Sequence, residues 1–291
     1  MSFFKKLFQS EQPPSHPLMD DDWRTTYWER KDEIIDGLRS LEVSNKSTAR
    51  LHILLVGPVS AGKSSFINSI DSIFQGRMTC AAITDASSNE SFTKMYQTHK
   101  IKNGIYGHYL PFVISDTMGL EEGYSKGLDP NYIVQAMQGQ LKDGHVFSAG
   151  HPCVEKATSP TLDDKIHCLV MVVPAHTMTM VQQDVIEKIR DIREKATELK
   201  IPQVALLTKV DEACPEVKKD LRLVYRSKKI ELKMTECHNR LGVNLSHIYP
   251  VKNYHKEAEL SDDMDVLLLT AFKNILNFAN DHVAEIPPTE D

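Results

Sequence analysis

Residues 51–70, LHILLVGPVSAGKSSFINSI, indicate the fold of this chain most directly. The first six residues of this stretch form an apolar run interrupted only by His52, which is typical of a β-strand buried on both faces of a parallel sheet. Residues 57–64 match the pattern G-x-x-x-x-G-K-[ST] without a mismatch, and a helix-like segment, KSSFINSIDSIF, begins at residue 63. A strand, a glycine-rich turn and a helix in this order predict a phosphate-binding loop.

The residue types of this loop have physical reasons. Gly57 and Gly62 let the backbone turn tightly and approach phosphate oxygens. The backbone N–H groups then form an anion site at the start of a helix. Lys63 is expected to reach the β- and γ-phosphates, and the Ser64 hydroxyl is a candidate Mg²⁺ ligand. The predicted nucleotide-binding residues of the loop are Gly57, Pro58, Val59, Ser60, Ala61, Gly62, Lys63, Ser64 and Ser65.

A second motif, Asp-Thr-Met-Gly at residues 116–119, follows the apolar run of residues 110–115. Ligands of open α/β sheets bind at the carboxyl ends of the strands. In phosphoryl-transfer enzymes an Asp at this place holds Mg²⁺, directly or through water. We therefore predict Asp116 as a metal residue beside Ser64, and Gly119 as a contact of the γ-phosphate. The alternative is an Asp that only caps a turn.

A third motif, Thr-Lys-Val-Asp at residues 208–211, ends the strand QVALLT. The carboxylate of Asp211 is suited to accept hydrogen bonds from guanine N1–H and the 2-amino group. Adenine has neither donor, so a buried carboxylate would be left unpaired against it. The stem of Lys209 can lie along the base plane, and Thr208 completes the motif. An ordinary polar turn is the alternative.

Strands and helices alternate through the rest of the chain. Further strands are expected at residues 92–101, 166–173, 203–208 and 247–251, and helices at 20–42, 131–141, 179–199, 216–240 and 261–283. This alternation predicts an α/β fold, a P-loop NTPase (G-domain-like) three-layer sandwich with a mostly parallel sheet and an N-terminal helical extension.

The expected organisation has four parts. Residues 1–19 form a flexible tail, and residues 20–48 carry a helix that docks on the core. Residues 49–283 form the P-loop domain, with an extended segment at 121–165. Residues 284–291 form a C-terminal tail.

Composition limits the function further. The chain has 291 residues, and its 34 Lys and Arg against 40 Asp and Glu give 34 − 40 = −6, which argues against non-specific nucleic-acid binding because no dominant positive field is available. No specific nucleic-acid partner is expected either. The five cysteines are scattered and form no CxxC pair, so a disulfide framework is not expected.

No apolar run is long enough to span a bilayer, and residues 1–9 lack the apolar core of a signal peptide. A cytoplasmic location is expected.

The three motifs occur in the order of the guanine-nucleotide-binding branch of P-loop proteins, which the chain resembles over about residues 50–280. More closely, HILLVGPVSAGKSSFINSI, YLPFVISDTMGL, DKIHCLVMVV, VALLTKVD and VKNY resemble the interferon-induced protein 44 family. This resemblance implies a cytoplasmic, interferon-inducible protein of antiviral innate immunity that binds GTP or GDP with Mg²⁺. It names no protein effector. Related large GTPases dimerise through the nucleotide face, so a homodimer is an open alternative.

Some positions depart from the pattern of that branch. Thr208 stands where many GTPases have an Asn that braces the phosphate loop, so a modest affinity is expected. Leu120 stands where Ras-like proteins carry a water-orienting Gln, and its side chain cannot hydrogen-bond water, so hydrolysis is expected to be slow. Asn253, in VKNY, is predicted to touch the base edge or to be an ordinary loop residue. The candidates for the nucleotide-sensing hydroxyl of the first switch are Thr84, Ser87, Ser88, Ser91 and Thr93.

Three functions remain open on these residues. The first is a GTP-dependent switch or scaffold with slow hydrolysis. The second is a pseudo-GTPase, an interaction module that does not hydrolyse GTP, which Leu120 and Thr208 favour. The third is an ATP-using P-loop enzyme, which the order of the motifs disfavours.

Weaker signals each have a plain alternative. His145, His151 and Cys153 lack a fourth zinc ligand at a recognisable spacing, so a surface loop is favoured. The basic face of residues 216–240 is diluted by acids and is interpreted as solvated. The aromatic and lysine residues at 3–8 allow weak contact with an anionic membrane, beside the simpler interpretation of a tail.

Overall fold

The computed structural model describes residues 16–82, 95–104, 107–123, 128–147 and 159–287. One sheet has the strand order β2-β3-β1-β4-β5-β6. The strands are β1 (Leu51–Val56), β2 (Gln97–Lys102), β3 (Tyr109–Asp116), β4 (Cys168–Pro174), β5 (Gln203–Thr208) and β6 (Ile248–Pro250). Neighbouring strands pair in parallel, except that β2 runs antiparallel to β3. The prediction of a mostly parallel sheet is confirmed.

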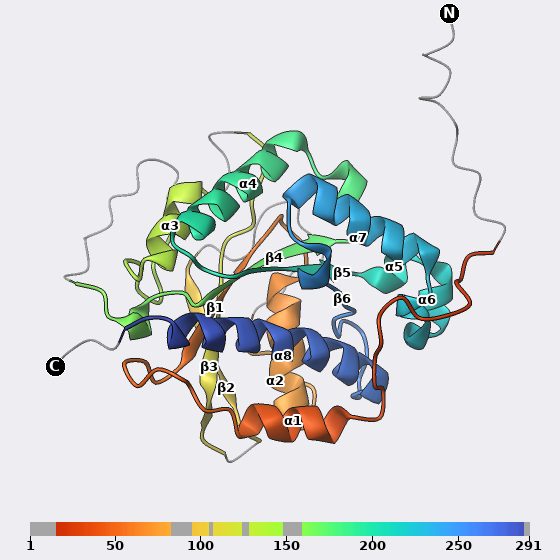
Figure 1. The fold of residues 1–291 in the computed structure, drawn as a ribbon, viewed down its shortest axis with the longest axis horizontal. Helices are drawn as coiled ribbons and strands as arrows, with labels where there is room; N and C mark the ends of the chain where they lie inside the picture. The colour runs from red at the N-terminus through yellow and green to blue at the C-terminus, as the bar shows by residue number, and fades with distance from the viewer. Residues whose placement is uncertain (1–15, 83–94, 105–106, 124–127, 148–158, 288–291) are drawn as a thin grey trace, which may run out of the picture.

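Helices cover both faces of the sheet (Figure 1). One layer contains α1 (Lys31–Arg39), α2 (Lys63–Gln75) and α8 (Asp262–Ala284). The opposite layer contains α3 (Pro130–Met137), α4 (Gln183–Glu198) and α7 (Lys228–Leu241), with the short helices α5 (Val210–Ala213) and α6 (Pro215–Lys219) at its end. One hydrophobic core therefore lies on each side of the sheet, as the prediction of a three-layer sandwich requires.

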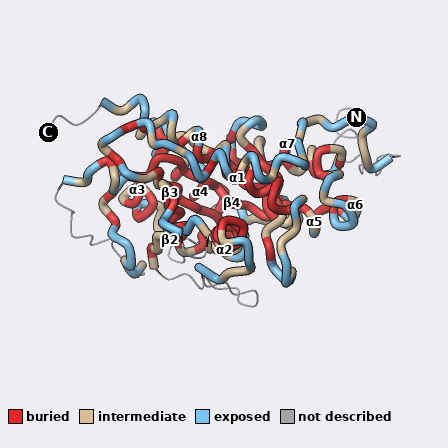
Figure 2. Tube along the Cα trace, turned by 90° about the horizontal axis from the view of Figure 1, so that it is seen from below, coloured by how far each residue is buried: buried red, intermediate tan, exposed pale blue. Residues whose placement is uncertain are grey.

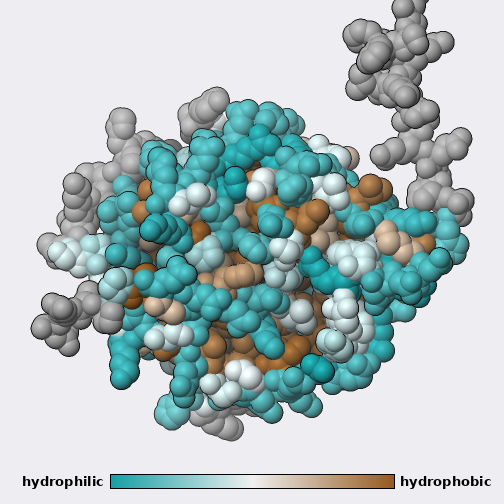
Figure 3. Space-filling model, viewed as in Figure 1, coloured by the Kyte–Doolittle hydropathy of each residue, from teal (hydrophilic) through white to brown (hydrophobic). Residues whose placement is uncertain are grey.

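The alternation of β1 shows how the sequence supplies both cores. Leu51, Ile53 and Leu55 face the core beneath α2 and α8. Leu54 and Val56 face the other core, because successive side chains of a strand point to opposite faces. The buried backbone thus runs through the middle of the molecule, with exposed residues on the outer helices and loops (Figure 2). The face seen in Figure 3 is mostly hydrophilic, with smaller apolar areas between the helices.

The expected helix over residues 20–42 is wrong in its first half. Only Lys31–Arg39 are helical. The preceding residues 17–24, which we call the N-terminal strap, lie beside residues 225–228. Met19 N–H donates to the Arg226 carbonyl at 2.8 Å, and Trp23 N–H donates to the Tyr225 carbonyl at 3.0 Å. The N–H groups of Met19 and Trp23 thus donate to residues 225–226 and not to carbonyls of a helix within the strap.

Helix α1 packs on α8. The Lys31 ammonium pairs with the carboxylate of Asp262 at 2.8 Å and with that of Asp265 at 2.7 Å. The side chains of Ile35 and Leu38 are buried in the same core as α8. The N-terminal extension is thereby joined to the last helix of the chain.

The expected single helix over residues 216–240 is also wrong. The chain forms α6, then a 3₁₀ segment at Leu221–Tyr225, and then α7. The Asp220 carboxylate accepts a hydrogen bond from Arg222 N–H, and the Ser227 hydroxyl accepts one from Ile230 N–H. Such side-chain caps start new helical segments and interrupt the basic face that a continuous helix would have had.

The remaining helix bounds differ by a few residues. Helix α3 ends at Met137 rather than at residue 141, and α4 begins at Gln183 after a 3₁₀ turn at Met178–Met180. Among the described residues, no helix combines the length and the apolar character that crossing a bilayer requires.

Candidate functional site

Four loops of the candidate site follow the carboxyl ends of strands at one edge of the sheet. Residues 57–62 follow β1, residues 117–120 follow β3, residues 209–211 follow β5 and residues 251–254 follow β6. Parallel strands place these ends together, which is where ligands of open α/β sheets bind. The hydrogen bonds described below join the phosphate loop to the loops after β3 and β6, and to Thr208 at the end of β5.

The phosphate loop depends on its two glycines. A Cβ atom on Gly57 would lie 2.0 Å from the carbonyl oxygen of Val172 on β4, so no larger residue fits there. Gly62 has a φ of +97° and precedes the first residue of α2. Ser60 adopts the left-handed region with a φ of +58°. A non-glycine residue held in this region is a sparsely populated conformation of the kind that clusters at ligand sites.

Lys63 is the charged centre of the loop. Its side chain is only 7% exposed. The Nζ atom donates to the carbonyl oxygens of Gly57 at 3.2 Å and Pro58 at 3.1 Å. Burial lowers the pKa of Lys63, and the nearby Asp116 carboxylate opposes that shift. The ammonium group is held by loop carbonyls, which phosphate oxygens can replace.

Ser64 and Asp116 are in direct contact. The Ser64 hydroxyl donates to Oδ2 of Asp116 at 2.5 Å, and Oδ1 of Asp116 accepts the N–H of Thr117 at 2.9 Å. Asp116 is 1% exposed. A hydroxyl and a carboxylate are hard oxygen donors of the kind Mg²⁺ prefers, usually with waters and substrate phosphates completing its shell. These two predicted metal residues therefore fit a magnesium ion.

The segment after Asp116 lies directly against the phosphate loop. Leu120 N–H donates to the Gly57 carbonyl at 3.0 Å, and Val59 N–H donates to the Leu120 carbonyl at 3.4 Å. A Cβ on Gly119 would lie 2.6 Å from Cγ2 of Val59 and 2.7 Å from its Cα. The glycine of the second motif is thus required by the close approach of the two loops.

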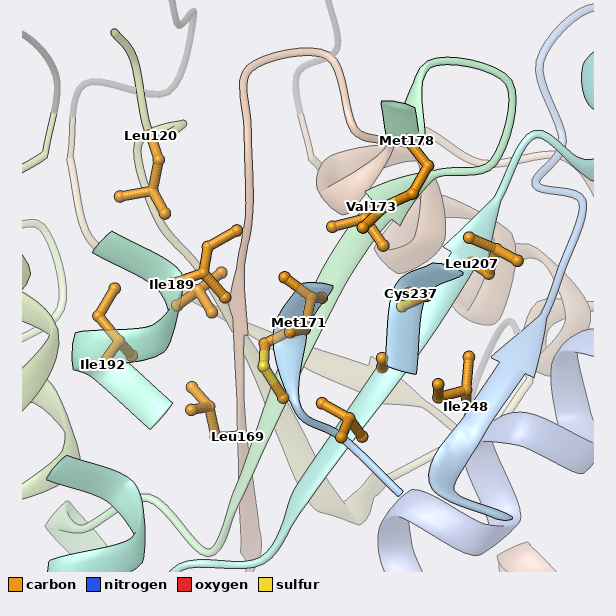
Figure 4. Close-up of a cluster of buried hydrophobic side chains, with 14 of the residues drawn as sticks. Leu120, Leu169, Met171, Val173, Met178, Ile189, Ile192, Leu207, Cys237 and Ile248 are labelled. Carbon is orange, nitrogen blue, oxygen red and sulfur yellow. The ribbon is translucent and has the colours of Figure 1, made fainter. Parts of the chain in front are cut away.

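The side chain of Leu120 belongs to a hydrophobic core. It is 2% exposed and belongs to the buried cluster that also contains Met171, Leu207 and Ile189, where it lies at the edge on the side of Ile189 (Figure 4). It is therefore not directed into water at the site. Leu120, which stands where Ras-like proteins carry a water-orienting Gln, is thus part of the apolar core.

Helix α4 holds the far end of the same segment, a feature that the sequence analysis did not identify. The Lys188 ammonium donates to the carbonyls of Glu121 and Gly123, each at 2.8 Å. The Asp184 carboxylate accepts the N–H of Gly123 at 2.6 Å. A signal was present in the sequence, because Lys188 falls on the apolar face of α4 beside Val185 and Ile192. A lysine in that position needs buried acceptors.

Thr208 braces the phosphate loop despite the absence of the usual Asn. Its Oγ1 donates to the carbonyl oxygen of Ala61 at 2.6 Å and lies 3.3 Å from that of Val173. Thr208 is fully buried. The hydroxyl therefore ties the end of β5 to the loop that follows β1.

The next residues of this motif turn away from the strand. Lys209 has a φ of +57° and precedes α5, whose first turn contains Asp211. Asp211 is partly exposed. The role of Asp211 in reading a guanine base stays a prediction.

Asn253 also contacts the phosphate loop. Its Nδ2 donates to the carbonyl oxygen of Gly62 at 2.9 Å. Its Oδ1 is buried and has no hydrogen-bond partner among the described residues. The predicted contact with the base edge is untested, but the amide nitrogen already has a partner in the loop.

Other predicted residues lie outside the part of the chain that the structure describes. These are the switch candidates Thr84, Ser87, Ser88, Ser91 and Thr93, together with His151 and Cys153. In the described ranges, no group of three or more His, Cys, Asp or Glu side chains is arranged to hold a metal ion.

Sequence comparison finds relatives over most of the chain. No protein-family model matches it. It is 33% identical over 267 residues to human interferon-induced protein 44-like, covering 90% of this chain and 59% of that protein. It is 34% identical over 266 residues to human interferon-induced protein 44, with 89% and 59% covered. The mouse interferon-induced protein 44 is 31% identical over 258 residues, with 87% and 60% covered. The chain thus spans about three-fifths of the length of these relatives.

Solved structures of similar fold include Toc33 from Arabidopsis thaliana in complex with GDP and Mg²⁺. That match has a TM-score of 0.47 and 13% identity, and covers 87% of this chain and 92% of the other. A probable GTP-binding protein, engB, matches with a TM-score of 0.44 and 14% identity, covering 79% and 98%. At these values the likeness adds nothing to the assignment of the site.

Proposed function

Because the chain belongs, over about nine-tenths of its length, to the interferon-induced protein 44 family, we propose that it is an interferon-induced protein that binds GTP and GDP with Mg²⁺. The binding residues are those of the 57–65 loop with Asp116, Gly119, Thr208, Lys209 and Asp211. One observation carries this proposal. The Lys63 ammonium is held in the phosphate loop, and the neighbouring Ser64 hydroxyl is hydrogen-bonded to Asp116, whose carboxylate acts electrostatically on Lys63.

Each group has a defined task in this proposal. Lys63 exchanges its carbonyl partners for β- and γ-phosphate oxygens, because an ammonium ion binds these anions more strongly than neutral acceptors. Ser64 and Asp116 would hold Mg²⁺, which supplies positive charge to the phosphates when it is bound. The Asp211 carboxylate accepts the donors of the guanine edge. Binding of ATP would leave that carboxylate facing an acceptor.

Hydrolysis is proposed to be slow. The Leu120 side chain is buried in the core and has no group that could orient an attacking water. The protein is therefore better suited to holding a nucleotide than to consuming it. This favours a switch or scaffold, and it also favours the second candidate, a pseudo-GTPase module that binds without hydrolysis.

The biological setting is proposed from the relatives' names. We place the chain in the interferon-induced antiviral response of innate immunity, acting in the cytoplasm. Its effectors are proteins that would recognise the nucleotide-dependent arrangement of residues 119–123.

The test is a comparison of GTP, GDP and ATP binding to purified protein with Mg²⁺. Calorimetry or fluorescent-nucleotide titration is expected to show guanine-selective binding that Lys63→Ala weakens by about 10- to 100-fold. Lys229→Ala, at an exposed lysine of α7, is the matched control and should bind as the wild type does. A preference for ATP would support the ATP-using alternative. A folded wild type that binds no nucleotide would end the proposal.

A further inference from the structure

We propose that Asn253 is a positioning residue of the phosphate loop, and that it completes with Thr208 a two-point brace of that loop. The inference rests on the proposed function, since the loop is taken to bind nucleotide phosphates. It assigns Asn253 to the phosphate side of the site, in place of the base edge that its position after β6 suggests.

The brace consists of two contacts on consecutive residues. Thr208 Oγ1 donates to the Ala61 carbonyl at 2.6 Å, and Asn253 Nδ2 donates to the Gly62 carbonyl at 2.9 Å. These carbonyls immediately precede Lys63, whose N–H and ammonium group belong to the anion site. Two donors from different strand ends therefore fix the peptide planes that aim this part of the loop.

The contact of Asn253 is close and has one permitted orientation. A Cβ added to Gly62 would lie 2.9 Å from Asn253 Nδ2, so the amide sits directly over the glycine. Turning the amide around would place Oδ1 against the Gly62 carbonyl, and two acceptors repel. The donor must face the loop, which leaves the buried Oδ1 without a partner among the described residues.

The residues around Asn253 hold it rigidly. The N–H of Tyr254 donates to the Ser69 hydroxyl on α2 at 3.0 Å, and the Tyr254 hydroxyl donates to Asp265 on α8 at 2.7 Å. On its other side, Lys252 pairs with Glu257 at 2.9 Å. Asn253 is thus mounted between α2 and α8, so its amide acts on the loop from a fixed support.

A positioning role and a base contact make different predictions for ligands. The first weakens any ligand that the loop holds by its phosphates, with or without a base. The second weakens only ligands that carry the base. Inorganic pyrophosphate with Mg²⁺ has phosphates alone, so it separates the two roles from each other.

The experiment measures competition of GDP and of pyrophosphate against a fluorescent guanine nucleotide. Asn253→Ala is expected to weaken both by the same factor, about tenfold, because the Gly62 carbonyl loses its side-chain donor and keeps only the N–H of Phe66, so this peptide plane is no longer fixed from the β6 side. Thr208→Val should do the same, whereas Asp211→Asn should weaken GDP and leave pyrophosphate unchanged. The control is Asn277→Ala, an exposed position on α8. Loss of GDP affinity with unchanged pyrophosphate affinity in Asn253→Ala would overturn the inference.

A second measurement needs no nucleotide. Hydrogen exchange of the backbone amides in residues 57–66 of the nucleotide-free protein is expected to be faster in Asn253→Ala than in Asn277→Ala. Equal exchange in the two variants would contradict the brace. If the wild type binds neither GDP nor pyrophosphate, the proposed function fails while this comparison still decides whether Asn253 holds the loop.

Discussion

The backbone N–H of Leu120 donates to the carbonyl oxygen of Gly57 at 3.0 Å, so the chain after Asp116 is hydrogen-bonded to the phosphate loop. In return, Val59 N–H donates to the Leu120 carbonyl at 3.4 Å. The amides of such a loop are the groups that bind phosphate. A ligand that recruits the Val59 N–H must therefore separate it from Leu120, and residues 119–123 are the part of the site expected to move.

Replacing Gly119 should disturb this contact between the loops. A Cβ at Gly119 would meet Val59 at 2.6–2.8 Å, so Gly119→Ala is expected to lower the free energy of unfolding by about 1–3 kcal/mol through overpacking. Urea denaturation measures this. Gly37→Ala is the control, because it lies in α1 with no atom within 4 Å of its added Cβ and should be neutral or stabilising. Equal stability of the two variants would show that the loops separate without strain.

Changing Asp211 should change the base that is preferred. Asp211→Asn presents an amide donor, which suits the C2 carbonyl of xanthine and opposes the 2-amino group of guanine. We expect GDP to bind at least about tenfold more weakly and xanthosine diphosphate more strongly. Competition titrations give both constants. The neighbouring Glu212→Gln is the control, and unchanged GDP affinity in Asp211→Asn would mean that this carboxylate does not read the base.

The wild type should turn GTP over slowly. With Leu120 in the core, we expect single-turnover hydrolysis below about 0.01 per second without a partner protein. Leu120→Gln should give no faster hydrolysis, since it puts an amide into an apolar core and destabilises the fold. Phosphate release under single-turnover conditions measures the rate. A wild-type turnover of several per second would contradict this prediction.

Lys188 should matter for stability because its ammonium serves buried carbonyls. Lys188→Met leaves the carbonyls of Glu121 and Gly123 without this donor, which is expected to lower the free energy of unfolding by about 1–3 kcal/mol. The exposed Lys195 on the same helix provides the control variant Lys195→Met. Thermal and urea unfolding compare the two. A pair of identical transitions would show that α4 does not hold the segment.

His167 should make the fold sensitive to acid. Its Nδ1 accepts the N–H of His52 at 3.0 Å and its Nε2 faces the Leu162 carbonyl at 3.0 Å, an arrangement that needs the neutral ring. Burial, with a contribution from nearby His52, lowers the pKa of His167 to about 4. Between pH 6.5 and 4 the unfolded chain binds a proton that the folded chain does not. Stability therefore falls as the pH falls through this window, by up to about 3 kcal/mol.

The measurement is urea denaturation at several pH values from 7.5 to 4.5. His167→Asn keeps a short acceptor for the His52 N–H and removes the titrating ring, so its stability should depend less on pH in that window. The pKa of His52 is also lowered by burial, and this contribution remains in the variant. The same slope in both proteins would exclude His167 as the cause.

Much of the fold was predictable because the sheet is buried on both faces. Residues 168–173 are continuously apolar and residues 51–56 are apolar except for His52, which is typical of the central strands of a parallel sheet. The N-terminal strap was not predictable. The spacing of Trp23 and Tyr27 fits a helix, but the strap is set by backbone partners at residues 225–228, some 200 residues away in the chain.

The candidate site divides in the same way. The glycines, Lys63, Ser64 and Asp116 were predictable, because phosphate and magnesium binding impose residue types at fixed spacing. The brace was not. A threonine hydroxyl or an asparagine amide becomes a donor to Ala61 or Gly62 only through the packing of β1, β5 and β6, which no local pattern contains. Lys188 is similar, since its acceptors are backbone carbonyls of a distant segment.

The docking of the strap on residues 225–228 and of α1 on α8 has a consequence for synthesis. The Lys31 ammonium forms ion pairs with Asp262 and Asp265, and the strap forms backbone hydrogen bonds with residues 225–228. The ribosome makes the strap and α1 before these partners, so the strap can dock only after residues 225–228 have left the exit tunnel, and α1 only after α8 has done so. Ile35, Leu38 and Trp23 thus present apolar surface to solvent while the central sheet is being translated. The strap and α1 therefore fold after segments that follow them in the chain, and chaperones would act on them during this interval.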